Sequence, residues 1–154
     1  MRNYCERLTI PIFPYSLKLF FSSRTTRRWW FFIFPLLGYA ALIFYLSSQS
    51  RWIFKLPDFF SADKFYHLLE YGVFGVLLAR LLEEYDFPPS YRKKITWVLI
   101  ISFLYGLSDE FHQWFVPGRS ATLGDALADS LGGGLGGWLF FKFKRKDSRF
   151  YSRP

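Results

Sequence analysis

An apolar run at residues 29–47 constrains this chain more than any other feature. It reads WWFFIFPLLGYAALIFYLS and contains no charged residue. A helix of about 20 residues crosses the hydrocarbon layer of a bilayer. A stretch of this length and purity therefore predicts a membrane-spanning helix.

Three further stretches have the length of a membrane span, at about residues 64–82, 95–114 and 123–141. Unlike the first, they carry ionisable groups. Aromatic residues make up 23% of the chain, and tryptophans lie near the expected helix ends, where amphipathic rings prefer the interface. These are Trp29, Trp30, Trp97, Trp114 and Trp138. We therefore expect an all-α polytopic membrane bundle of four transmembrane helices, forming one domain at residues 29–141.

The distribution of positive charge predicts the orientation of this bundle. Sixteen of the twenty Lys and Arg residues fall within residues 1–28, residues 80–94 and residues 142–154. Basic residues concentrate on the cytoplasmic side of membrane proteins. We expect both termini in the cytoplasm, with residues 1–28 as a basic cytoplasmic or interfacial segment (including a short interfacial helix at 15–21) and residues 142–154 as a basic tail.

The same distribution argues against other classes of protein. The net charge of +8 could suggest a nucleic-acid partner, but the basic residues flank apolar stretches and no nucleic-acid-binding module is present. The single cysteine, Cys5, cannot form an intramolecular disulfide. The expected partner is the lipid bilayer, and not nucleic acid.

The fourth stretch carries small residues at every fourth position, namely Gly124, Ala128, Gly132 and Gly136. Such a row lets another helix approach closely. The neighbouring row is Asp125, Asp129, Gly133 and Gly137. The two aspartates therefore continue a packing face and should point away from lipid.

Polar residues gather at one end of the expected bundle. On the predicted topology this end is extracytoplasmic. The candidates for a polar pocket are Asp63, His67, Glu70, Asp109, Glu110, His112, Gln113, Arg119, Asp125 and Asp129. An ionisable group in lipid costs several kcal/mol, so such groups face a bundle interior or trapped water. We expect His67, Asp109, His112, Arg119 and Asp129 in one cluster that joins the last three helices.

Several of these residues also have purely structural interpretations. Thr122 and Asp125 have the spacing of a capping box at a helix N-terminus. Arg119 could pair with Asp109 or Asp125, or could receive an anionic group. The acids and histidines could form a hydrogen-bonded network, act in acid/base chemistry, or bind zinc or another divalent ion. No HExxH or comparable motif is present, so the sequence assigns no metal ligand and no cofactor.

Two motifs in this polar set resemble a known family. The first is Asp63-Lys64-Phe65-Tyr66-His67 with Glu70-Tyr71. The second is Asp109-Glu110-Phe111-His112-Gln113, followed by Phe115-Val116-Pro117-Gly118-Arg119 and then Asp125. Together with Ser47-Ser48-Gln49-Ser50, they resemble the VanZ-like family over about residues 46–137. The resemblance implies a multi-pass bacterial plasma-membrane protein and a link to glycopeptide (teicoplanin) resistance.

Two functions from different classes follow from these observations. The first is a non-enzymatic envelope protein whose outer-leaflet polar pocket binds a polar or anionic head group, such as that of a lipid-linked molecule. The alternative is a membrane-embedded hydrolase or transferase that uses the His, Asp and Glu residues of the cluster, with or without a metal ion.

Overall fold

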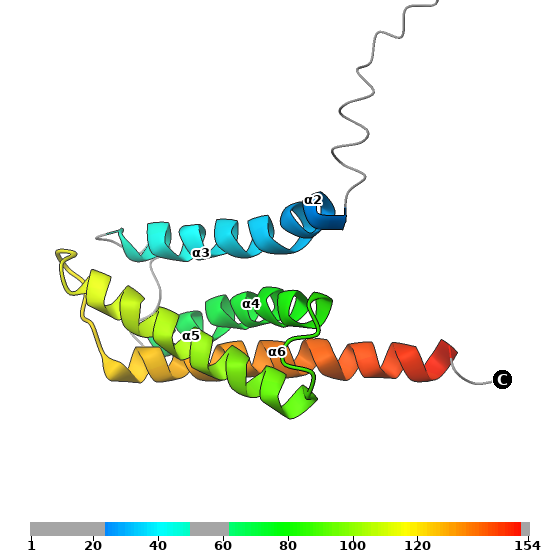
Figure 1. Ribbon diagram of the computed structural model, residues 1–154. Helices are drawn as coiled ribbons and strands as arrows, with labels where there is room; N and C mark the ends of the chain where they lie inside the picture. Colours follow the sequence, from blue (N-terminus) through cyan, green and yellow to red (C-terminus); the bar gives the residue numbers. More distant parts are fainter. Residues whose placement is uncertain (1–23, 50–61, 152–154) are drawn as a thin grey trace, which may run out of the picture.

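The computed structural model describes residues 24–49 and 62–151, and every regular element in these two ranges is helical. The elements are α2 (Arg24–Arg28), η1 (Trp29–Ile33), α3 (Phe34–Ser47), α4 (Ala62–Glu84), α5 (Tyr91–Gln113) and α6 (Leu123–Tyr151). The helices run up and down, so that the end of α3, the start of α4, the end of α5 and the start of α6 share one end of the molecule (Figure 1). We call this the polar end.

The first helix widens just before Pro35. The N–H of Phe34 donates to the carbonyl of Trp29, five residues back, and residues Trp29–Ile33 form a π-helical turn. Proline has no N–H and its ring crowds the preceding turn. Wider turns of this kind accommodate such a break within an otherwise continuous helix. The helix then continues to Ser47, where the sequence predicted its end.

Helix α6 packs on α4 through the glycine row found in the sequence. A Cβ atom added to Gly132 would collide with the backbone of Leu68, and one added to Gly136 would collide with the backbone of Gly72. From the other side of the interface, a Cβ atom added to Gly75 of α4 would collide with the backbone of Gly133. The predicted packing face is therefore confirmed, and its partner is α4.

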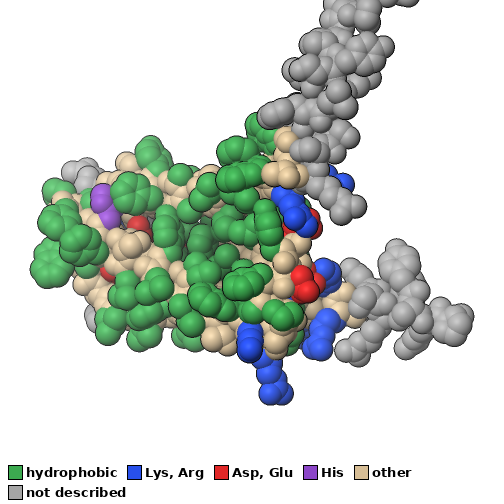
Figure 2. Space-filling view, viewed as in Figure 1, with side chains coloured by type: hydrophobic (Ala, Val, Ile, Leu, Met, Phe, Trp, Pro, Cys, Tyr) green, Lys and Arg blue, Asp and Glu red, His purple; other side chains and the backbone are tan. Residues whose placement is uncertain are grey.

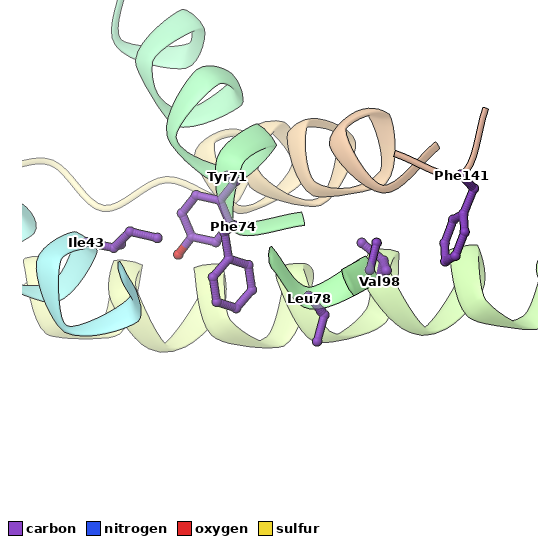
Figure 3. Packing of buried hydrophobic residues seen from close by; sticks show 7 residues of the cluster. Ile43, Tyr71, Phe74, Leu78, Val98 and Phe141 are labelled. Atoms are coloured by element: carbon purple, nitrogen blue, oxygen red, sulfur yellow. The ribbon is translucent and has the colours of Figure 1, made fainter. Parts of the chain in front are cut away.

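The apolar core lies where α3, α4, α5 and α6 meet. Its buried members are Ile43, Tyr71, Phe74, Leu78, Ala79, Val98 and Phe141 (Figure 3). Two tyrosine hydroxyl groups attach α3 to this core. The Oη of Tyr39 donates to the carbonyl of Glu70 at 3.1 Å, and that of Tyr105 to the carbonyl of Ala40 at 2.7 Å.

The outer surface is strongly apolar between the two ends, as Figure 2 shows for one face. Leu37, Leu104 and Leu131 are each more than half exposed. Charged residues in Figure 2 gather at the end opposite the polar end. There Arg28 pairs with Glu84 at 3.0 Å, and Glu83 accepts from both Lys94 and Lys144 at 2.7 Å.

Two helices in the described residues are long and apolar enough to cross a membrane, Thr25–Ser47 and Lys64–Glu84. The all-α class is thus confirmed within these residues. The fourth helix was predicted to end near residue 141, but α6 continues to Tyr151. Lys and Arg are good helix formers and no Gly or Pro interrupts residues 142–151. The expected interfacial helix at 15–21 lies outside the described residues.

Candidate functional site

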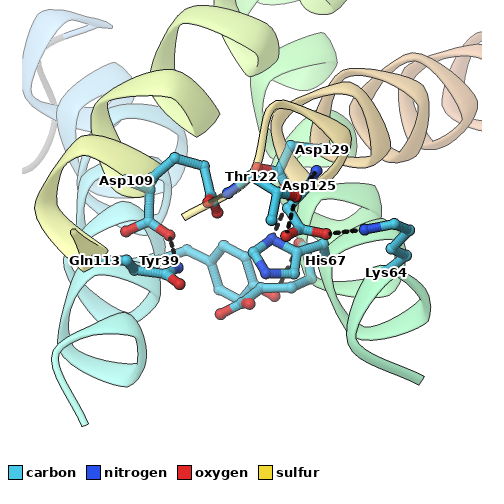
Figure 4. A network of polar contacts seen from close by, with 10 residues as sticks. Tyr39, Lys64, His67, Asp109, Gln113, Thr122, Asp125 and Asp129 are labelled. Atoms are coloured by element: carbon cyan, nitrogen blue, oxygen red, sulfur yellow. Dashed lines mark hydrogen bonds and ion pairs between the residues drawn. The ribbon is translucent and has the colours of Figure 1, made fainter. Parts of the chain in front are cut away.

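The polar end contains a cluster of buried polar and charged side chains contributed by α4, α5 and α6 (Figure 4). The buried members are His67, Asp109, Glu110, Gln113, Asp125 and Asp129. Burying so many ionisable groups is costly unless each is paired or hydrogen-bonded. The contacts within the cluster therefore decide what it can do.

The innermost group joins all three helices through His67. Its Nδ1 lies 2.9 Å from Oδ1 of Asp129, across the α4–α6 interface. Glu110 of α5 completes the group, because one ligand atom from each of the three side chains lies within 4.8 Å of the others. Asp129 is fully buried and His67 is 4% exposed. An imidazole with two carboxylates this close suits either proton transfer or metal binding.

Gly106 of α5 makes room for this group. A Cβ atom added to Gly106 would lie 2.5 Å from Oδ2 of Asp129. The carboxylate of Asp129 thus occupies the space that the side chain of any residue other than glycine at position 106 would fill.

The start of α6 forms a second layer of contacts. Thr122 caps this helix, since its Oγ1 accepts from the N–H of Asp125 at 3.2 Å and donates to Oδ2 of Asp125 at 2.6 Å. In a capping box the N–H of Thr122 would go to Asp125, but here it donates to Oε2 of Glu110 at 2.7 Å. The Oδ1 of Asp125 binds Lys64 Nζ at 2.7 Å. Asp125 therefore has a structural role at this helix terminus.

Asp109 and Gln113 occupy consecutive turns of α5. The Nε2 of Gln113 donates to Oδ2 of Asp109 at 3.0 Å. Glu70 of α4 is half-buried on the same side as His67. The remaining predicted acid, Asp63, lies in the first turn of α4, but its side chain is outside the described residues.

His112 contacts a different helix from the one that His67 contacts. Its Nε2 is 2.9 Å from Ser48 Oγ, and its ring lies 4.2 Å from that of Phe44, measured between centroids. Residues two apart on a helix point in nearly opposite directions, so Glu110 faces α6 whereas His112 faces α3. The structure thus gives different partners to the two histidines that the sequence grouped together.

Arg119 is placed by a tight turn. The N–H of Arg119 donates to the carbonyl of Val116 at 3.2 Å, and Gly118 has a φ of 83°. Pro at the second position and Gly with positive φ at the third are typical of a type II turn. Arg119 interacts electrostatically with Glu70, which brings a guanidinium group to the acidic cluster.

Four carboxylate oxygen atoms of the cluster are buried without a hydrogen-bond partner among the described residues. They are Oε1 of Glu70, Oδ1 of Asp109, Oε1 of Glu110 and Oδ2 of Asp129. Buried polar atoms are almost always satisfied in proteins. The cluster therefore has capacity for a ligand that brings positive charge or hydrogen-bond donors.

Lys64 and Ser48 were not among the sequence-predicted pocket residues, although both contact members of that set. No periodicity links Lys64 to Asp125, because they belong to different helices. The sequence did carry two signals: both residues lie in segments that resemble the VanZ-like family, and a lysine within a predicted span needs a buried partner.

A comparison with protein-family models matches residues 8–145 to VanZ/LLP1. A search of curated proteins and a search of solved structures gave no match. The match covers α2 to α5, α6 up to residue 145, and both polar motifs.

Proposed function

This chain belongs to the VanZ/LLP1 family, and on that basis we propose that it is a multi-pass protein of the bacterial plasma membrane that binds an envelope ligand. Its polar cluster faces the outer leaflet and receives the polar or anionic head group of a lipid or lipid-linked molecule. The resemblance to the VanZ-like family connects this role with glycopeptide (teicoplanin) resistance.

Helix length supports four spans. α5 and α6 contain 23 and 29 residues, and about 20 are needed to cross the hydrocarbon layer. Both are less apolar than the first two helices because they carry basic residues at one end and the buried cluster at the other. Those acids face the bundle, so their charge does not meet lipid.

The two ends of the bundle support the orientation. The end with Arg28, Lys94 and Lys144 holds most of the positive charge and would face the cytoplasm. In a Cys5→Ser background, a cysteine at Arg92 should then resist an impermeant maleimide applied to intact cells. A cysteine at Ser120 should react. The reverse pattern would contradict the orientation and with it an outward-facing site.

The observation that carries the ligand proposal is the set of buried carboxylate oxygens without hydrogen-bond partners in the described part of the chain, together with two cationic side chains at the same end of the bundle. Hydroxyl or ammonium groups of a head group would donate to the free oxygens. A phosphate would meet Arg119 and Lys64, whose side chain is 46% exposed. Arginine binds phosphate through two parallel donors.

The test compares the binding of phosphatidylglycerol with that of phosphatidylcholine to the purified protein in nanodiscs. We expect selective binding of the anionic lipid. Arg119→Lys should weaken it by about tenfold, because lysine keeps the charge but loses the two-pronged geometry. Arg92→Lys is the matched control and should bind like the wild type.

Teicoplanin susceptibility of cells expressing each variant, with protein abundance measured in the same membranes, connects binding to phenotype. Arg119→Lys should reduce protection at unchanged abundance. Full abundance with lost protection in Asp109→Asn, but not in Arg119→Lys, would overturn the binding proposal and favour chemistry.

A membrane-embedded hydrolase or transferase is the second candidate, favoured by the contact between His67 Nδ1 and Asp129 Oδ1. A carboxylate that accepts from one imidazole nitrogen orients the ring and stabilises the imidazolium that forms when the histidine acts as a general base. His67→Gln would then abolish turnover of a lipid-linked substrate, whereas Arg119→Lys would raise KM and leave measurable kcat.

A further inference from the structure

His67, Glu110 and Asp129 have the chemistry and the spacing of a metal site. One imidazole nitrogen and two carboxylate oxygens lie within 4.8 Å of one another. Ligand atoms lie about 2.0–2.2 Å from Zn²⁺ in a tetrahedral site, so any two of them are about 3.4 Å apart. Small side-chain rotations would bring these three donors to a common ion.

In both Glu110 and Asp129, one carboxylate oxygen has a partner and the other has none among the described residues. Oε2 of Glu110 accepts from the N–H of Thr122 at 2.7 Å, while its Oε1 is buried without a hydrogen-bond partner in the described part of the chain. Oδ1 of Asp129 contacts His67, while its Oδ2 is likewise unsatisfied. Contacts that hold one ligand atom orient the other toward a metal ion.

Charge and burial point the same way. Glu110 is 5% exposed and Asp129 is fully buried, and Asp109 lies near enough to add its negative charge to that of Asp129. Two carboxylates beside a third in a space of low dielectric attract a cation strongly. A divalent ion would neutralise this charge and satisfy the free oxygens together.

We propose that His67, Glu110 and Asp129 bind one divalent metal ion of the Zn²⁺ class. An imidazole with two carboxylates suits zinc better than magnesium or calcium, which prefer oxygen ligands alone. Three protein ligands leave a coordination position open. For its role this inference rests on the proposed function, since an oxygen of the bound head group would occupy that position.

The first experiment measures metal stoichiometry and affinity. The full chain is purified in detergent without a polyhistidine tag, stripped with a chelator, exposed to ZnCl₂ and passed through gel filtration. Elemental analysis should give one zinc per chain. Separate His67→Gln, Glu110→Gln and Asp129→Asn variants should each bind zinc at least about tenfold more weakly.

His112→Gln is the matched control, because it makes the same change to the other histidine at the same end of the bundle. It should keep full zinc affinity, since His112 contacts Ser48 and Phe44. Zinc affinity lost equally in both histidine variants, or tighter binding of Mg²⁺ than of Zn²⁺, would overturn the assignment.

A second experiment measures zinc binding in the wild-type chain and uses a variant only to assign the signals. The chain contains two histidines, so ¹⁵N-histidine labelling gives two imidazole signals. Saturating Zn²⁺ should shift the ring nitrogens of one histidine, identified as His67 by the absence of the other signal in His112→Gln. Zinc that leaves both rings unchanged would refute the site.

The two proposals fail in different ways. Zinc binding without any preference for phosphatidylglycerol would leave the metal site in place and remove the head-group function. Selective lipid binding that persists after complete removal of zinc, with no zinc rebinding, would remove the metal site alone.

Discussion

Replacing Gly136 by alanine tests the close contact between α4 and α6 directly. The added Cβ would lie 2.9 Å from the carbonyl carbon of Gly72 and 3.2 Å from its Cα, whereas ordinary contacts begin near 3.4 Å. The obstacle is backbone, so no side-chain rotation can relieve it. The two helices would have to move apart, which would loosen the α4–α6 interface that supports the polar cluster.

The magnitude follows from two opposing effects. Alanine gains about 1 kcal/mol over glycine in helix propensity. Overpacking a well-packed interface costs about 1–3 kcal/mol, and separating two backbones belongs to the upper part of this range. We therefore expect a net loss of about 1–2 kcal/mol for Gly136→Ala. Gly38→Ala makes the same chemical change where nothing lies within 4 Å of the new atom, and it should be neutral or stabilising by up to about 1 kcal/mol.

The assay is reversible unfolding of the purified protein in mixed micelles, followed by circular dichroism as the fraction of denaturing detergent rises. Gly136→Ala should unfold at a lower fraction than the wild type, and Gly38→Ala at the same fraction or higher. Equal stability of the two variants would refute the proposed packing of α6 on α4.

Two further predictions concern the polar end. Gly106→Ala places a Cβ 2.5 Å from Oδ2 of Asp129, so it should reduce zinc affinity by at least about tenfold. Wild-type zinc affinity in this variant would show that the Asp129 carboxylate is not a ligand. Lys64→Met leaves the buried carboxylate of Asp125 without its ion-pair partner and should cost about 1–3 kcal/mol in the micelle assay, whereas Lys144→Met, at an exposed pair, should cost less than about 1 kcal/mol. Equal losses in the two lysine variants would contradict a structural role for the first pair.

Local features of the sequence anticipated much of the fold. The apolar runs gave the helices, and the small-residue row gave the packing face of α6, because both depend only on side-chain type and helical periodicity. The turn that carries Arg119 follows from Pro117 and Gly118, which prefer a type II turn in any context. Thr122 capped α6 as expected, since that contact spans only three residues.

The tertiary structure decided which polar residues meet. His67 and His112 were equivalent by composition and depth, yet only His67 lies with Glu110 and Asp129. Helical periodicity gives the direction of a side chain around its own helix, but not the rotation of that helix relative to its neighbours. That rotation is set by close packing, here by glycines on α6 that admit the backbone of α4 and the side chains of α5 to close contact. In this arrangement His112 faces α3.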